Sequence, residues 1–198
     1  MVDTASRHMT AAEFLAWCSR REDERWELVG GTPVRIAPME MMAGARRRHD
    51  RIVVNLIVAL RTRLRGGPCQ PYTADFALLT AKGENVRRPD VMIDCSDGKG
   101  DDLAAVEPAA AFEVLSPSNA NFTRFSKVDE YKAVPTLRHI VVLDSDAARL
   151  VLYSRAANDA WTSEMVEGER AAARLSGFGI ELTLAEIYAD VSFDDVEG

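Results

Sequence analysis

The stretch Arg88-Pro89-Asp90-Val91-Met92-Ile93, with the later stretch Phe112-Glu113-Val114-Leu115-Ser116-Pro117, decides the fold. Each reads as a β-strand of apolar residues that carries one carboxylate near its edge, Asp90 in the first and Glu113 in the second. A carboxylate in an apolar run is costly to bury unless a cation compensates its charge. Lys127, on the helix expected to follow, is the nearest candidate cation in the sequence.

Two carboxylates and one amine brought together at strand ends can hold a divalent metal beside a phosphodiester. Mg²⁺ prefers one or two carboxylates together with waters and phosphate oxygens. We therefore expect Asp90 and Glu113 to bind the metal, and Lys127 to orient the attacking water or to stabilise the transition state. Tyr131 lies four residues after Lys127 on the same helix face, which predicts a packed ring with its hydroxyl near the site.

The remaining pattern predicts an α/β (α+β) fold, in which helices flank a mixed sheet. No internal repeat or linker is visible, so a single domain over residues 1–198 is expected, with its core at about 10–190. Capping boxes are predicted at Thr10 with Glu13 and at Thr183 with Glu186. The expected helices cover about 10–19, 46–64, 122–133 and 183–189, and the expected strands cover 25–29, 33–36, 72–79, 87–95, 110–115, 138–143, 150–154 and 161–166.

Composition narrows the classes of protein. The chain has 198 residues, is 47% hydrophobic and carries a net charge of −7, which argues against a broadly basic nucleic-acid-binding surface but leaves room for a local basic cleft. No apolar run approaches the roughly 20 residues of a membrane span, and residues 1–10 lack the apolar core of a signal peptide. Cys18, Cys69 and Cys95 are odd in number and far apart, which predicts reduced thiols in a cytoplasmic protein.

Several motifs together resemble the Uma-type restriction endonuclease family of the PD-(D/E)xK nuclease superfamily, over roughly residues 10–190. The resemblance implies a restriction-endonuclease-like fold and DNA cleavage that depends on Mg²⁺, with Mn²⁺ as a substitute. The motifs that carry it are Trp26-Glu27-Leu28-Val29-Gly30-Gly31, His49 at the start of the long helix, Pro89-Asp90-Val91, Glu113-Val114-Leu115-Ser116-Pro117-Ser118, Lys127 with Tyr131, and Val142-Leu143-Asp144.

Two departures from the superfamily pattern keep a rival function open. The lysine expected two residues after the glutamate is Leu115 here, and in this family it is displaced to the following helix as Lys127. The family often has an Asp where this chain has Thr123. The alternative is a catalytically degraded module that binds nucleic acid or protein without cleavage. A hydrolase of another phosphoester is a second rival.

Further residues have both a functional and a structural interpretation. Glu27 is either a third acidic group of the site or a solvated hairpin residue, and His49 is either a site residue or a core histidine. Arg46, Arg47, Arg48 and Arg51 either contact phosphates or form a solvated helix face. Structural alternatives also exist for the main candidates: Asp90 as a strand-entry residue, Glu113 paired with Arg88, and Lys127 exposed to solvent. DNA is the expected partner, and a homodimer is expected because cutting both strands requires two sites.

Overall fold

The protein is described by a computed structural model that covers residues 8–21, 24–36, 43–80, 83–115, 126–168 and 170–193, without the side chains of residues 43–46. Its largest element is a mixed sheet with the strand order β10-β9-β8-β7-β6-β3. Strands β7 and β8 run parallel, and the other neighbours in this sheet are antiparallel. The strands are β3 (Gln70–Thr73), β6 (Val91–Asp94), β7 (Pro108–Leu115), β8 (His139–Asp144), β9 (Arg149–Arg155) and β10 (Trp161–Glu167).

The parallel pair at the centre of this sheet determines where a helix must lie. Parallel neighbours need a crossover connection, because the chain has to return to the edge at which the first strand began. The connection from β7 to β8 contains helix α4 (Val128–Lys132), preceded by a helical turn at Ser126 and Lys127. Lys127 is therefore carried back over the sheet face that bears Glu113.

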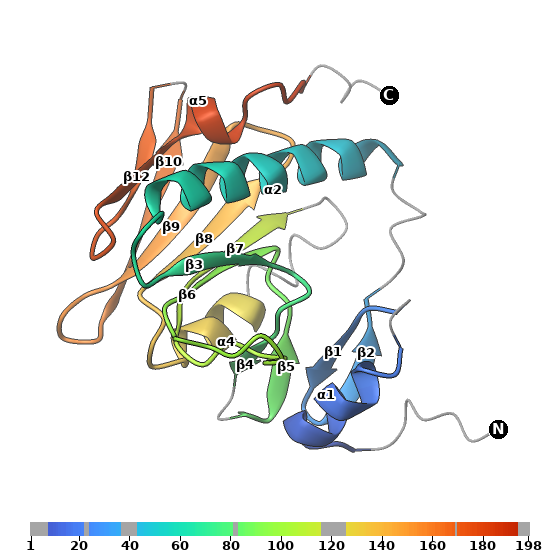
Figure 1. The fold of residues 1–198 in the computed structure, drawn as a ribbon. Coiled ribbons are helices and arrows are strands. Elements are labelled where there is room, and N and C mark those ends of the chain that lie inside the picture. The colour runs from blue at the N-terminus through green and yellow to red at the C-terminus, as the bar shows by residue number, and fades with distance from the viewer. Residues whose placement is uncertain are drawn as a thin grey trace.

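Two apolar clusters cover the two faces of the sheet. Helix α2 (Ala43–Arg63) lies across one face, where its buried stripe packs against Phe112 and Val114. Helix α4 lies on the opposite face, where Tyr131 packs with Met92 and Leu115 (Figure 1). Side chains along β6 and β7 alternate between these two clusters, and the predicted fold class of a mixed sheet flanked by helices is confirmed. The buried stripe of α2 consists of Ile52, Leu56, Ala59, Leu60 and Leu64.

A second sheet, with the order β2-β1-β5-β4, lies beside the first and packs against helix α1. Gly30 and Gly31 form the turn between β1 and β2 with φ angles of 53° and 74°, which glycine adopts without a steric penalty. The hairpin of β11 and β12 was not predicted. The elements are α1 (Ala11–Cys18), β1 (Trp26–Val29), β2 (Thr32–Arg35), β4 (Leu78–Thr80), β5 (Asn85–Arg87), β11 (Ala172–Leu175), β12 (Ile180–Thr183) and α5 (Leu184–Ile187).

Two strands expected to be continuous are each split between the two sheets. The expected strand 72–79 ends at Thr73, where a turn closes through the Phe76 N–H bonded to the Thr73 carbonyl, and β4 begins five residues on. The expected strand 87–95 is interrupted at residues 88–90, since Pro89 has no N–H to donate to a ladder. These breaks let the chain pass from one sheet to the other. The expected helix 122–133 is described only from residue 126 onward.

The cysteine prediction is wrong for two of the three residues. Cys69 and Cys95 form a disulfide, and Cys18 is free. The register of β3 with β6 explains the pairing, since Gln70 lies opposite Asp94 and the adjacent residues are therefore also opposite each other. Sequence spacing alone could not show this, because the pairing depends on strand register. None of the helices in the described ranges is long and apolar enough to cross a membrane.

The two predicted capping boxes have different outcomes. At α1 the Thr10 side chain accepts from the Glu13 N–H while the Glu13 carboxylate accepts from the Thr10 N–H, as predicted. At α5 the Thr183 hydroxyl accepts from the Glu186 N–H at 3.2 Å. The Glu186 carboxylate instead accepts from Arg63 of α2 at 2.8 Å. The Glu186 side chain thus links helices α5 and α2.

Candidate active site

Glu113, Lys127 and Tyr131 form a buried cluster on the α4 face of the central sheet. The Lys127 ammonium lies 3.2 Å from Oε1 of Glu113, and the Tyr131 hydroxyl donates to the same oxygen at 2.6 Å. Glu113 is 4% exposed and Lys127 is 9% exposed, so the solvated interpretation of Lys127 is wrong. The crossover from β7 to β8 produces the contact between Lys127 and Glu113, because it carries the lysine to the sheet face that Glu113 shares with the uncharged Leu115.

The electrostatics of the cluster fix the protonation of its cation. Burial raises the pKa of Glu113 to about 7, against the lowering effect of Lys127 and with a further increase from the nearby charge of Asp90. For Lys127, burial acts to lower the pKa, but the charges of Glu113 and Glu27 outweigh it and raise the pKa above its usual value. Lys127 is therefore an ammonium at neutral pH. Burial also raises the pKa of Tyr131, which stays a hydrogen-bond donor.

Asp90 precedes β6 and is fixed by contacts from two elements. Its Oδ2 accepts from the Val114 N–H of β7 at 2.7 Å, and its Oδ1 lies 3.2 Å from Nε2 of His49 on α2. The carboxylate thus lies beside the strand that bears Glu113. Burial acts to lower the pKa of His49, but the hydrogen bond and charge of Asp90, with the charge of Asp50, raise it overall. His49 is a partner of Asp90 rather than a core histidine packed among apolar groups.

Glu27 of β1 also belongs to the cluster. It is 6% exposed, so the interpretation as a solvated hairpin residue is wrong. Its Oε1 lies 3.0 Å from the Lys127 ammonium, and its Oε2 accepts from Arg87 at 3.0 Å. Arg87 in turn binds Glu130 of α4. Sequence reasoning missed Arg87 and Glu130; the available signals were an arginine between apolar strands and a glutamate three residues after Lys127 on the same helix.

Some sequence candidates lie apart from this cluster. Arg88 does not pair with Glu113: its guanidinium donates to the backbone carbonyls of Trp26, Ala74 and Asp75. Arg48 forms an ion pair with Asp146 at 3.1 Å. Arg47 and Arg51 are exposed. Residues 116–118 of the serine-proline motif and Thr123 lie outside the described residues, as does the side chain of Arg46.

The charge balance of the cluster fits a divalent cation. Two cations face four carboxylates, which leaves two negative charges in excess when all are ionised. Among the described residues, no three His, Cys, Asp or Glu side chains are arranged to hold a metal by themselves. Mg²⁺ prefers one or two carboxylates together with waters and phosphate oxygens, and Asp90 and Glu113 would supply donors of that type. The cations are Arg87 and Lys127, and the carboxylates are Glu27, Asp90, Glu113 and Glu130.

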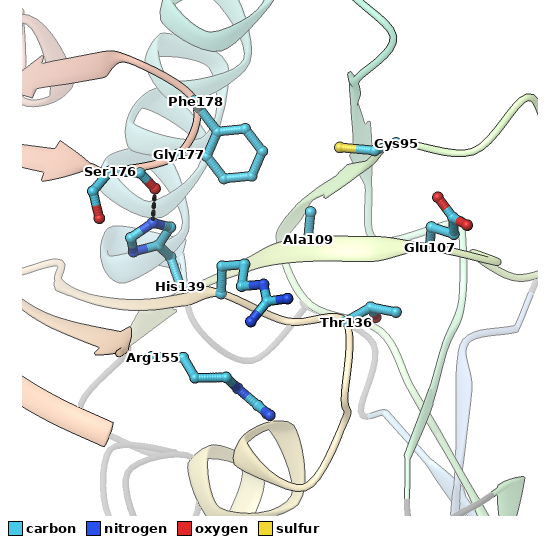
Figure 2. Close-up of a pocket in the computed structure, with 10 residues that line it drawn as sticks. Cys95, Glu107, Ala109, Thr136, His139, Arg155, Ser176, Gly177 and Phe178 are labelled. Atoms are coloured by element: carbon cyan, nitrogen blue, oxygen red, sulfur yellow. Dashed lines mark hydrogen bonds between the residues drawn. The ribbon is translucent and has the colours of Figure 1, made fainter. Parts of the chain in front are cut away.

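A cavity in the described part of the chain lies elsewhere, at the opposite end of the central strands. It has a volume of about 610 Å³, and its wall includes Cys95, His139 and Arg155 (Figure 2). Nε2 of His139 donates to the Ser176 carbonyl at 2.7 Å, so Nδ1 of the neutral ring accepts from the Ser154 hydroxyl at 3.1 Å. Burial lowers the pKa of His139. This cavity contains none of the candidate site residues.

Comparison with known proteins identifies first the class of fold and then the family. A crystal structure from Anabaena variabilis, described as a putative nuclease belonging to DUF820, superposes with a TM-score of 0.66 at 14% identity, covering 91% of this chain and 97% of that one. The fold is thus shared with a nuclease-like protein. The family model of Uma2, described as "Putative restriction endonuclease", matches residues 11–185, and the chain belongs to this family. An uncharacterized protein of Synechocystis is 29% identical over 174 residues, covering 86% of this chain and 94% of its own length.

Proposed function

We propose that this protein is a metal-dependent DNA endonuclease, with Asp90 and Glu113 as the metal ligands and Mg²⁺ or Mn²⁺ as the cofactor. The observation that carries the proposal is a buried ammonium shared by Glu113 and Glu27, with the charge of Asp90 close enough to raise the pKa of Glu113. One ammonium cannot compensate both carboxylates when they are ionised, so an added cation would stabilise the site. The membership of the Uma2 family supports nucleic acid as the substrate.

The side chains have separable tasks in phosphodiester hydrolysis. A bound metal would lower the pKa of a water and offset charge on the phosphate. The Val114 N–H and His49 hold Asp90 in place, and Tyr131 orients Glu113. Because the pKa of Lys127 is raised, its ammonium donates hydrogen bonds to the attacking water or to a phosphate oxygen and does not remove a proton. Lys127 is thus an electrostatic stabiliser of the transition state rather than a general base.

Arg47 and Arg51 supply a surface for the DNA backbone. Both are exposed on the helical turns that flank His49, and neither has a recorded ion-pair partner among the described residues. Arginine side chains neutralise phosphates and release counterions, which makes binding dependent on salt. This local basic surface reconciles DNA binding with the net charge of −7. The proposal includes a homodimer, since one site would cut one DNA strand and cutting both strands requires two sites.

The test is nicking of supercoiled plasmid by purified protein with Mg²⁺ or Mn²⁺. Asp90→Asn, Glu113→Gln and Lys127→Met should each abolish metal-dependent nicking. Lys132→Met, on the same helix but over the Tyr153 ring, is the matched control and should cleave normally. Nicking that survives all three changes would contradict the site. Absence of nicking with retained DNA binding would favour the non-cleaving module, and RNA and a small phosphodiester assayed in parallel would reveal another substrate.

A further inference from the structure

Arg87 is a buried arginine for which the reaction outlined above has no direct use. Its side chain is 1% exposed in β5. Nη1 donates to Oε2 of Glu27 at 3.0 Å, and Nε donates to Oε2 of Glu130 at 2.8 Å, while Nη2 binds Oε1 of Glu130. One rigid guanidinium therefore joins a strand of the second sheet to helix α4.

Both carboxylates held by Arg87 lead to Lys127. Glu27 binds the Lys127 ammonium directly at 3.0 Å. Glu130 lies three residues further along the helix that starts directly after Lys127, and Thr80 and Asn85 each donate to its Oε2 at 2.9 Å. Arg87 thus restrains the lysine twice, at its amine through Glu27 and at its backbone through Glu130.

Glu27 contacts two permanent cations, Lys127 and Arg87, which suits it to positioning the lysine better than to binding a metal. Oε1 accepts from the Arg88 N–H at 3.1 Å and contacts Lys127, and Oε2 accepts from Arg87. With both oxygens engaged, this carboxylate keeps Lys127 in place independently of Glu113. Lys127 then retains one anionic partner when Glu113 serves as a metal ligand.

We propose that Arg87 is a positioning residue that sets the location of the Lys127 ammonium through Glu27 and Glu130. Its link to catalysis rests on the proposed nuclease function, whereas the placement of Lys127 does not. Replacing a buried ionic group by apolar residues of similar volume is often neutral or stabilising, so such networks are a poor means of increasing stability. Three buried charges held at fixed geometry instead define one place for the amine.

The first test measures the exposure of Lys127 without any activity assay. The full-length protein is treated briefly with an amine-acetylating reagent, and mass spectrometry gives the modification rate of Lys127 relative to exposed Lys99. Arg87→Met should raise this ratio severalfold, because Glu27, the partner of the amine, loses the arginine that holds it in place. Leu182→Ala, which opens a cavity in β12 far from the site, controls for general destabilisation and should leave the ratio unchanged.

The second test separates positioning from folding. Arg87→Met removes the cation shared by buried Glu27 and half-buried Glu130, so the triple variant Arg87→Met, Glu27→Gln, Glu130→Gln also removes those charges and should recover the melting temperature. Lys127 should nevertheless remain more reactive in it. In plasmid nicking, kcat should fall about 100-fold in both variants with KM for DNA unchanged, as a misplaced catalytic group does.

The outcomes distinguish the two proposals. An unchanged Lys127 ratio in both variants, or a triple variant that regains the wild-type ratio together with its stability, would overturn the positioning role. If Arg87→Met raises the Lys127 ratio but the wild-type protein cleaves no phosphodiester, the positioning role stands and the nuclease function is contradicted. If Arg87→Met fails to fold, the double variant Arg87→Met, Glu130→Gln, which keeps Glu27 beside Lys127, decides the question against the Leu182→Ala control.

Discussion

Both ends of the central sheet bury polar groups, but the groups are neutral and hydrogen-bonded at one end and charged at the other. At the cavity end, His139 is neutral and has a partner on each ring nitrogen. At the other end, Glu113 shares one lysine with Glu27, and the charge of Asp90 adds to the repulsion. The first arrangement is complete without a ligand. The second would gain from an added cation, which is why we propose the metal site at this end.

The largest expected effect comes from removing a carboxylate at the charged end. Glu113→Gln should lower the nicking rate at least about 1,000-fold, since loss of a transition-state electrostatic group typically costs 10²–10³ and this residue also binds the metal. His139→Gln, at the cavity end, keeps an amide donor for the Ser176 carbonyl and should retain the wild-type rate. Equal losses in the two variants would remove the functional distinction between the two ends.

Reduction of the disulfide tests the cavity end as a structural region. Cys69 and Cys95 close a loop with a sequence separation of 26. Reduction should lower the free energy of unfolding by about 2–4 kcal/mol, since the cross-link restricts the unfolded chain. Urea unfolding with and without dithiothreitol measures the change. The variant Cys69→Ala, Cys95→Ala should show no response to the reductant, and a wild-type protein that also shows none would contradict the cross-link.

His49 should contribute less than the carboxylates because it acts through Asp90. His49→Asn should lower apparent metal affinity or activity about 10–100-fold, as loss of an outer partner of a metal ligand does. The measurement is the Mg²⁺ concentration that gives half-maximal nicking. Val58→Ala, an exposed change on the same helix, is the control. A His49 variant with unchanged metal dependence would make the histidine a packing residue.

The smallest effect is a pH dependence at the cavity end. Because burial lowers the pKa of His139 below its usual 6.5, the unfolded state binds the proton first as pH falls. Its contribution to stability is present above about pH 6.5 and is lost as pH falls through the folded-state pKa. The urea midpoint should therefore decrease more between pH 8 and pH 5.5 for the wild-type protein than for His139→Gln. Glu107, Arg138 and Arg155 line the same cavity, and comparison of the two proteins subtracts their shared contribution.

The sequence predicted which residues of the candidate site share a strand or helix face better than it predicted contacts between distant segments. Apolar alternation was sufficient to place Glu113 with Leu115 on one sheet face, because a strand has only two faces. The shared face of Lys127 and Tyr131 followed from helical spacing, and both contact Glu113. Contacts between distant segments were not predictable: Arg87 with Glu27 and Glu130 depends on how the two sheets meet. The Cys69–Cys95 bond likewise depends on the register of β3 and β6.

The crossover between β7 and β8 has a consequence for synthesis of the chain. Glu27 and Arg87 are 60 residues apart, Glu113 lies further along, and Lys127 comes only with the connection to β8. The chain is synthesised from its N-terminus, and a domain generally folds as a unit. The two carboxylates nearest Lys127 are therefore made long before their cation. A nascent chain that ends before residue 127 holds Glu27 and Glu113 without the lysine. The ion pairs of the candidate site can therefore form only late in translation.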